Sequence, residues 1–141
     1  MKLKNIMTSE VEVVRPDETL QSAAQKMLDR DIGFLPVCDG ERLVGALSDR
    51  DVTIRAVAKG MDPRTTKVQD LVHSKVIWCF DDDNVSEAAR KMKENQVRRL
   101  MVIQRDDKKL VGVVSLGDLA QNGTEKISSS VLQKVSAPAG Q

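Results

Sequence analysis

Two short motifs of the form Ser-x-x-Asp contain the residues of this chain best suited to bind a ligand. They are Ser48-x-x-Asp51 and Ser115-x-x-Asp118, and each lies where a predicted strand turns into a predicted helix. The first turn of a helix presents unpaired backbone N–H groups and the positive end of the helix dipole, which favour a phosphate. A serine hydroxyl there can donate to a phosphate oxygen, and a carboxylate one turn later can accept from both hydroxyls of a ribose. The motifs therefore indicate contact with ribose and phosphate.

The same pattern also has a purely structural interpretation. A serine at the N-cap with an acid three residues later resembles a capping box, in which the two side chains satisfy each other's backbone N–H groups. Each motif follows a glycine, Gly45 or Gly112, where a missing side chain permits close approach of backbone or ligand. This repetition favours ligand contact in at least one copy, and the sequence leaves the capping interpretation open.

Three arginines form the second set of candidate residues. Arg98 and Arg99 are adjacent, and Arg50 lies inside the first Ser-x-x-Asp motif. The planar guanidinium group presents paired donors that match the geometry of phosphate. The alternative is that these arginines pair with surface acids, which contributes little to stability. We predict phosphate contact for Arg98 and Arg99, with Arg50 as a third candidate cation.

No pattern typical of catalysis or metal binding accompanies these residues. The chain has no GxSxG, HExxH, P-loop or GxGxxG sequence. Its one histidine, His73, lies outside both motifs, so a serine nucleophile would lack a base. Cys38 and Cys79 fall in apolar stretches without a CxxC pattern and are predicted to be buried and reduced. We predict no catalytic residue, no metal ligand and no enzymatic activity.

The elements that position the candidate residues occur twice. Residues 6–51 reappear in order as residues 71–118, at an offset of 65 that becomes 67 after an insertion near Asp106. A duplicated unit of this size indicates two copies of one module, each of which covers the open face of the other. The interface between the copies is then the natural place for a ligand.

Each copy is predicted to have the order strand, helix, strand, strand, helix. In the first copy an extended stretch at 11–14 precedes a helix that is capped by Thr19. Strands at 34–38 and 43–47 follow, and a second helix runs from Ser48 to about Ala58. The apolar face of the first helix has helical spacing and consists of Leu20, Ala23, Ala24 and Met27.

The second copy follows the same order. Asn84 and Glu87 are predicted to form a capping box at the start of its first helix. Strands are predicted at 100–103 and 110–114, and a helix opens at Ser115 and ends near residues 122–123. A short helix at 68–71 precedes this copy. Ile127, Val131 and Val135, four residues apart, predict a further helix before a loose tail at 136–141.

Composition limits the class of protein. The 141 residues are 40% hydrophobic and 30% charged, with a net charge of +1 that argues against a dedicated nucleic-acid binder. No apolar run approaches the roughly 20 residues that span a membrane. The basic start is followed by no apolar stretch, so we expect no signal peptide and a cytoplasmic protein. The predicted domains are repeats at 1–62 and 63–123, with a C-terminal helix and tail at 124–141.

The duplicated pattern resembles tandem cystathionine β-synthase (CBS) domains, a pair called a Bateman module. The resemblance covers nearly the whole chain. In its length and its two repeats, the chain is similar to stand-alone bacterial two-CBS proteins of the hypoxic-response type. It implies an α/β (α+β) fold of two tandem β-α-β-β-α repeats packed as a pseudo-two-fold module. The residues that carry it are 5–8, 31–37 and 43–51 in the first copy and 96–100 and 110–118 in the second.

The resemblance implies a regulatory module for signal transduction that senses an adenosine-containing ligand in the cleft between its repeats. AMP is the favoured ligand, with ATP, NAD and S-adenosylmethionine as alternatives. CBS proteins use the Ser/Thr-x-x-Asp element for ribose and phosphate. The gamma subunit of AMP-activated protein kinase has phosphate-binding basic residues at positions that match Arg98 and Arg99. The implied nucleotide-binding residues are Ser48, Arg50, Asp51, Arg98, Arg99, Ser115 and Asp118.

The two copies also depart from each other. Met101 stands where the first copy has Pro36, at a position where the family usually has proline. Gly117 stands where the first copy has the basic Arg50. The two sites should therefore differ, and one of them is expected to stay empty or to prefer an uncharged nucleoside portion.

Association of two chains is a further expectation. CBS pairs commonly associate face to face, and the helices carry apolar residues, such as Val52, Val57 and Leu119, that one sheet would leave partly uncovered. These features predict a homodimer. The alternative function is a ligand-independent dimerising adaptor or stress protein.

Overall fold

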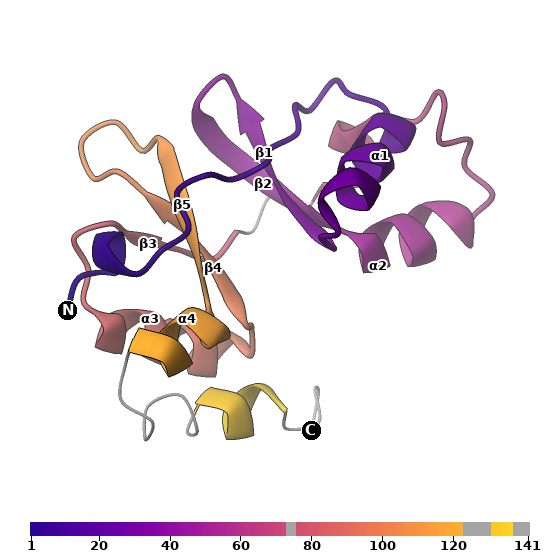
Figure 1. Ribbon diagram of the computed structural model, residues 1–141. Coiled ribbons are helices and arrows are strands. Elements are labelled where there is room, and N and C mark those ends of the chain that lie inside the picture. The colour runs from indigo at the N-terminus through magenta and orange to yellow at the C-terminus, as the bar shows by residue number, and fades with distance from the viewer. Residues whose placement is uncertain (73–75, 123–130, 137–141) are drawn as a thin grey trace. The chain divides into compact units, whose positions relative to one another are not determined.

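The chain folds into two compact units, each of which contains most of one copy of the duplicated sequence (Figure 1). The computed structural model describes residues 1–72, 76–122 and 131–136. One unit comprises Met1–Val11 and Ile77–Gln141, and the other comprises Glu12–Val76. Met1–Val11 therefore belong to the unit of the second copy, whereas the sequence predicted them to be part of the first repeat. His73 and Ile127 lie outside the described residues.

The unit of Glu12–Val76 contains helix α1 (Leu20–Arg30), a two-stranded antiparallel sheet of β1 (Phe34–Asp39) and β2 (Arg42–Ser48), and a second helix. The second helix begins as α2 (Asp49–Asp51) and continues as η2 (Val52–Val57), and a short η3 follows (Val68–Asp70). The strand expected at 11–14 is reduced to one bridge, between Val14 and Val37.

The other unit contains a three-stranded sheet of β3 (Trp78–Phe80), β4 (Arg99–Ile103) and β5 (Leu110–Ser115), in this order. Strands β3 and β4 are parallel and are connected by helix α3 (Val85–Asn95), and β4 and β5 are antiparallel. The N-terminal segment, indigo in Figure 1, joins this unit through a bridge between Thr8 and Val113 of β5. Residues 131–135 are helical. The unit also contains the short η1 (Leu3–Asn5) and helix α4 (Leu116–Asn122).

The two copies repeat fine details of backbone and side chain. The register shifts after Val37 in β1 and after Val102 in β4, so the same bulge occurs at both copies of this position. A lysine occurs at the same position of both copies. The ammonium group of Lys26 donates to the carbonyl of Val13 at 2.8 Å, and that of its counterpart Lys91 donates to the carbonyl of Trp78 at 2.6 Å. These lysines tie each first helix to the segment before it, which gives their repetition a structural cause.

The helix starts agree with the sequence prediction in part. Thr19 caps α1, and its hydroxyl accepts from the N–H of Ser22 at 3.1 Å. Asn84 precedes α3 as predicted, but its side chain makes no capping hydrogen bond, so the predicted capping box with Glu87 is wrong. The carboxylate of Glu87 instead bonds to the guanidinium of Arg90, one turn further along the helix. Ion pairing along the helix surface has replaced the reciprocal cap.

Each unit has its own hydrophobic core. The predicted apolar face of α3 lies wholly in its core, and three of the four residues predicted for α1 are buried; Ala24 is exposed, so its assignment to the buried face is wrong. Leu119 of α4 is fully buried, because it packs in the same core cluster as Met92 of α3. The expectation that Leu119 is partly uncovered is therefore wrong. Val57 is 64% exposed, as expected. The buried residues of α1 are Leu20, Ala23 and Met27, and those of α3 are Val85, Ala88, Ala89 and Met92.

Across the part of the chain that the structure describes, every helix is too short or too polar to span a bilayer.

Candidate functional site

Both Ser-x-x-Asp motifs form complete capping boxes at the end of a β-hairpin. In the first copy, the N–H of Asp51 donates to the Ser48 hydroxyl at 3.1 Å, and the N–H of Ser48 donates to Oδ2 of Asp51 at 3.0 Å. In the second copy, the corresponding distances between Ser115 and Asp118 are 3.1 and 2.8 Å. The structural interpretation of the motif is therefore confirmed in both copies.

Capping leaves room for a second role of the same residues. The capping bond of Asp118 uses its oxygen Oδ2, so a ribose would bond to the other oxygen, Oδ1. The Ser115 hydroxyl accepts one hydrogen bond from Asp118, and its own proton remains a donor for a ligand oxygen. Contact with ribose and phosphate stays a prediction for these residues.

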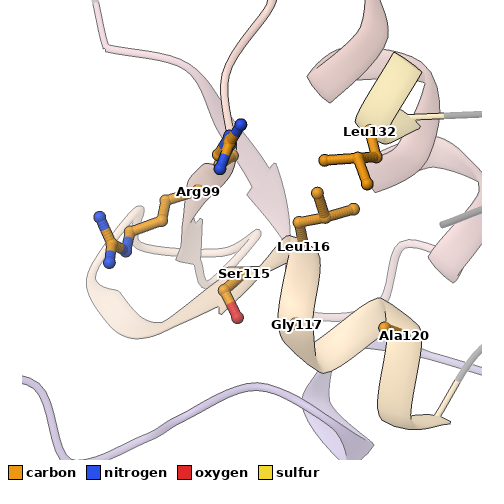
Figure 2. Close-up of a pocket in the computed structure, with 7 residues that line it drawn as sticks. Arg99, Ser115, Leu116, Gly117, Ala120 and Leu132 are labelled. Atoms are coloured by element: carbon orange, nitrogen blue, oxygen red, sulfur yellow. The ribbon is translucent and has the colours of Figure 1, made fainter. Parts of the chain in front are cut away.

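A cavity of about 520 Å³ lies beside the second motif (Figure 2). Its size falls in the range of small-molecule sites, roughly 300–1,000 Å³. Three of the predicted site residues, Arg98, Arg99 and Ser115, line it together. The remaining lining residues are Leu116, Gly117, Ala120 and Leu132.

The pairing of β4 with β5 brings the arginines to the motif. Arg99, the first residue of β4, lies directly opposite Ser115, the last residue of β5. The carbonyl of Arg98 accepts from the N–H of Leu116 at 2.9 Å, which fixes the backbone before β4 against the start of α4. Both arginines are exposed, and Arg98 reaches the Ser136 hydroxyl only at the long distance of 3.5 Å. A guanidinium held this loosely can turn toward a phosphate.

The cavity has a cationic side and an apolar side. Figure 2 shows Arg99 on the side of the cavity away from Leu132. Leu116 and Ala120 of α4 and Leu132 of the C-terminal helix supply apolar surface. An amphipathic molecule that carries an anionic group suits this arrangement.

The first copy has the opposite charge at the equivalent place. Gly33 stands at the position of Arg98, and its carbonyl accepts from the N–H of Asp49 at 2.9 Å. A Cβ atom on Gly33 would lie 2.7 Å from Oδ2 of Asp49, so this carboxylate occupies the space beside the glycine. A carboxylate this close repels a phosphate. The two copies therefore differ in charge at this position, although Arg50 follows directly, and which of the two sites takes a phosphate stays a prediction.

The sequence missed part of the cavity. Leu116, Ala120 and Leu132 line it, but an apolar residue carries no motif that marks it as a ligand contact. The helical spacing of Val131 and Val135 predicted the C-terminal helix without showing where it docks. Ser48, Arg50 and Asp51 lie in the other compact unit, at the end of β2 and in α2.

Gly112 has a structural reason to be glycine. A Cβ atom there would lie 2.6 Å from Sδ of Met7 and 2.8 Å from the carbonyl oxygen of Thr8. The N-terminal segment of the chain therefore occupies the space beside Gly112. The glycine at this position is explained by that packing and does not support a ligand contact.

The two cysteines are buried and free, as predicted. Cys38 lies in β1 and Cys79 in β3, inside the two sheets. Burial raises the pKa of each thiol from 9.0 to about 11. Both are therefore protonated at neutral pH, and a protonated thiol is a poor nucleophile and metal ligand.

The raised pKa values of the two thiols predict that the folded protein loses stability at alkaline pH. The pKa of each thiol is higher in the folded protein than in the unfolded chain. The contribution of each protonated thiol to the free energy of unfolding is therefore fully present below pH 9.0 and is lost as the pH rises toward about 11. Urea unfolding at several pH values should show a smaller loss for the double variant Cys38→Ala/Cys79→Ala than for the parent. Equal pH dependence of the two proteins would contradict this expectation.

Comparison with known proteins gives the same two-copy organisation. A family model described as CBS domain matches residues 3–57 and 68–124. Hypoxic response protein 1 of Mycobacterium tuberculosis is 36% identical over 136 residues, which cover 96% of this chain and 94% of that protein. The CBS domain-containing protein YhcV of Bacillus subtilis is 36% identical over 120 residues, 85% of this chain and 84% of that protein.

Solved structures agree with the fold. A crystal structure of hypoxic response protein I with two coordinated zinc ions superposes with a TM-score of 0.78 at 38% identity, over 86% of this chain and 98% of that one. In residues 1–72, 76–122 and 131–136 of the present chain, no group of three or more His, Cys, Asp or Glu side chains is placed to hold a metal ion. CBSX2 in complex with AMP gives a TM-score of 0.72 at 28% identity, over 85% of this chain and 93% of that one.

Proposed function

Because this chain belongs to the CBS-domain family, we propose that it is a regulatory module that senses an adenosine-containing ligand, with AMP the favoured member. CBS-domain pairs are regulatory modules, and we propose that this one has no catalytic activity of its own. The observation that carries the proposal is the cavity lined by Arg98, Arg99 and Ser115. The AMP complex of CBSX2 supports the choice of ligand.

Each part of an adenosine monophosphate has a proposed partner. The phosphate binds Arg98 and Arg99, which are exposed and line the cavity. The hydroxyl of Ser115 donates to the same phosphate, and Oδ1 of Asp118 accepts from the ribose. Ser48, Arg50 and Asp51 form the proposed second site, where the Asp49 carboxylate disfavours a phosphate and an uncharged nucleoside portion fits better.

A nucleotide panel with a thermal-unfolding readout tests this proposal. A ligand that binds only the folded protein raises its stability by about 2.7 kcal/mol at a concentration of 100 times the Kd, so AMP should raise the melting temperature by several degrees. ATP, NAD and S-adenosylmethionine are the competing ligands, and guanosine monophosphate controls for non-specific phosphate binding. An unchanged melting temperature with every adenosine compound would favour the ligand-independent adaptor instead.

We also propose that the protein is a homodimer. Val57 and Ile54 of η2 and Leu28 of α1 are large, exposed apolar side chains in the unit of Glu12–Val76. Light scattering should give twice the chain mass of 15.6 kDa at micromolar concentration. Val57→Glu should shift the mass toward one chain, because it places a charge in the interface, whereas the exposed Gln69→Glu should not. A single-chain mass for the parent at all micromolar concentrations would contradict the dimer.

A further inference from the structure

The C-terminal helix, residues 131–135, docks firmly on the unit that contains the cavity. Val131 is fully buried in the core cluster of that unit, and Val135 packs against the same cluster. The side-chain amide of Gln96 donates to the carbonyl of Lys134 at 3.2 Å. This helix lies outside both segments that match the CBS-domain model, residues 3–57 and 68–124. Its contacts are therefore made by residues outside the two CBS-domain matches.

One residue of the helix faces the cavity. Leu132 is 47% exposed, and it lines the cavity together with Leu116 and Ala120 of α4 (Figure 2). Single exposed leucines are common on protein surfaces and need no explanation. Here, however, the leucine completes an apolar wall across the cavity from Arg99, at a place where a ligand would remove it from water.

We infer that the C-terminal helix is a working part of the binding site, and that Leu132 covers the base of the bound nucleotide. The inference rests on the proposed function and adds to it the wall that recognises the base. The flat apolar faces of adenine match the leucine surface, and the phosphate then reaches Arg99 across the cavity. Binding affinity in such a site comes largely from the burial of apolar surface.

A consequence is that ligand and helix stabilise each other. A ligand that contacts Leu132 binds the docked helix better than the undocked one, so binding favours docking, and docking raises affinity by the same factor. The contact between Arg98 and Ser136 has the opposite sign, because a phosphate on Arg98 competes with the serine at the end of the helix, but at 3.5 Å this contact is weak and subtracts little from the coupling.

Leu132→Ala in the full-length chain tests the inference. Alanine is the best helix former, so the variant removes the wall and keeps the helix. We expect affinity for AMP and for adenosine to fall by the same factor, at least about fivefold, because both ligands carry the same base. Gln133→Ala, at an exposed position of the same helix that does not line the cavity, should bind both as the parent does.

Hydrogen exchange gives the second readout. In the parent protein, AMP should slow amide exchange in residues 131–136, and this protection should shrink in Leu132→Ala at equal occupancy. If the parent binds AMP but Leu132→Ala binds it equally well, or if exchange of this helix is unchanged by AMP, the inference is wrong and the proposed function stands. If the parent binds neither AMP nor adenosine, both are wrong.

Discussion

Replacement of both Arg98 and Arg99 by glutamine is expected to weaken the binding of AMP about tenfold or more, while the binding of adenosine changes little. A hydrogen bond to a charged group contributes roughly 1.5–3 kcal/mol, so the loss of even one such bond gives this effect. Glutamine keeps the polarity and much of the length of arginine but lacks its charge and its paired donors. Calorimetric titration of the parent and the double variant with both ligands measures the difference.

A matched control separates this local effect from the change of net charge. Arg15 and Arg64 are exposed arginines of the other unit, with side chains 69% and 75% exposed, and each pairs with an acid two residues away. The double variant Arg15→Gln/Arg64→Gln loses the same charge and should bind AMP as the parent does. AMP affinity of the parent should also fall as salt rises, since the arginines are exposed. If the Arg98/Arg99 variant binds AMP and adenosine like the parent, the arginines do not bind phosphate.

Replacement of Asp118 or Asp51 by alanine is expected to have two separate effects. Each variant loses the carboxylate of a capping box, which should lower the free energy of unfolding by about 0.5–2 kcal/mol. Each should also remove the ribose contact of one site and weaken adenosine binding there about tenfold, because two hydroxyls lose a charged acceptor. Chemical denaturation measures the first effect, and calorimetry measures the second.

Thr19→Ala is the control for capping alone. The Thr19 hydroxyl caps α1 through the N–H of Ser22, so its loss should destabilise the protein by a similar amount without any change of affinity. If Asp51→Ala and Asp118→Ala both behave like Thr19→Ala, the motif serves only to cap its helices and the ribose assignment is wrong.

Much of the fold follows from local patterns in the sequence. The helical spacing of Leu20, Ala23 and Met27, and of its repeat in α3, placed both helices, because burial of one helix face depends on residues one turn apart. Both hairpins were predicted from apolar stretches separated by polar turns, and the starts of α2 and α4 from the serines that follow the second strand of each hairpin. The capping box of Asn84 failed because Glu87 has a competing partner in Arg90, and a spacing pattern does not show such competition.

Features that depend on distant contacts were missed. The first strand of the first copy was predicted as a strand, but it makes only one bridge, which depends on its partner in β1. The N-terminal segment packs on β5 of the second copy because Gly112 leaves space for Met7 and Thr8. The cavity shows both cases: its charged and hydroxyl residues were found through their chemistry, whereas Leu132 entered it through the docking of a helix.

The most direct test of the account is a titration of the ¹⁵N-labelled protein with AMP, followed by amide chemical shifts. We expect saturable shifts that concentrate at residues 98–99, 115–120 and 131–136, since these residues form the cavity and the helix that borders it. Adenosine should reproduce the shifts near Leu132 and cause smaller ones at Arg98 and Arg99. Absence of any saturable shift, or shifts confined to residues away from this cavity, would contradict the claim that it is a nucleotide-sensing site.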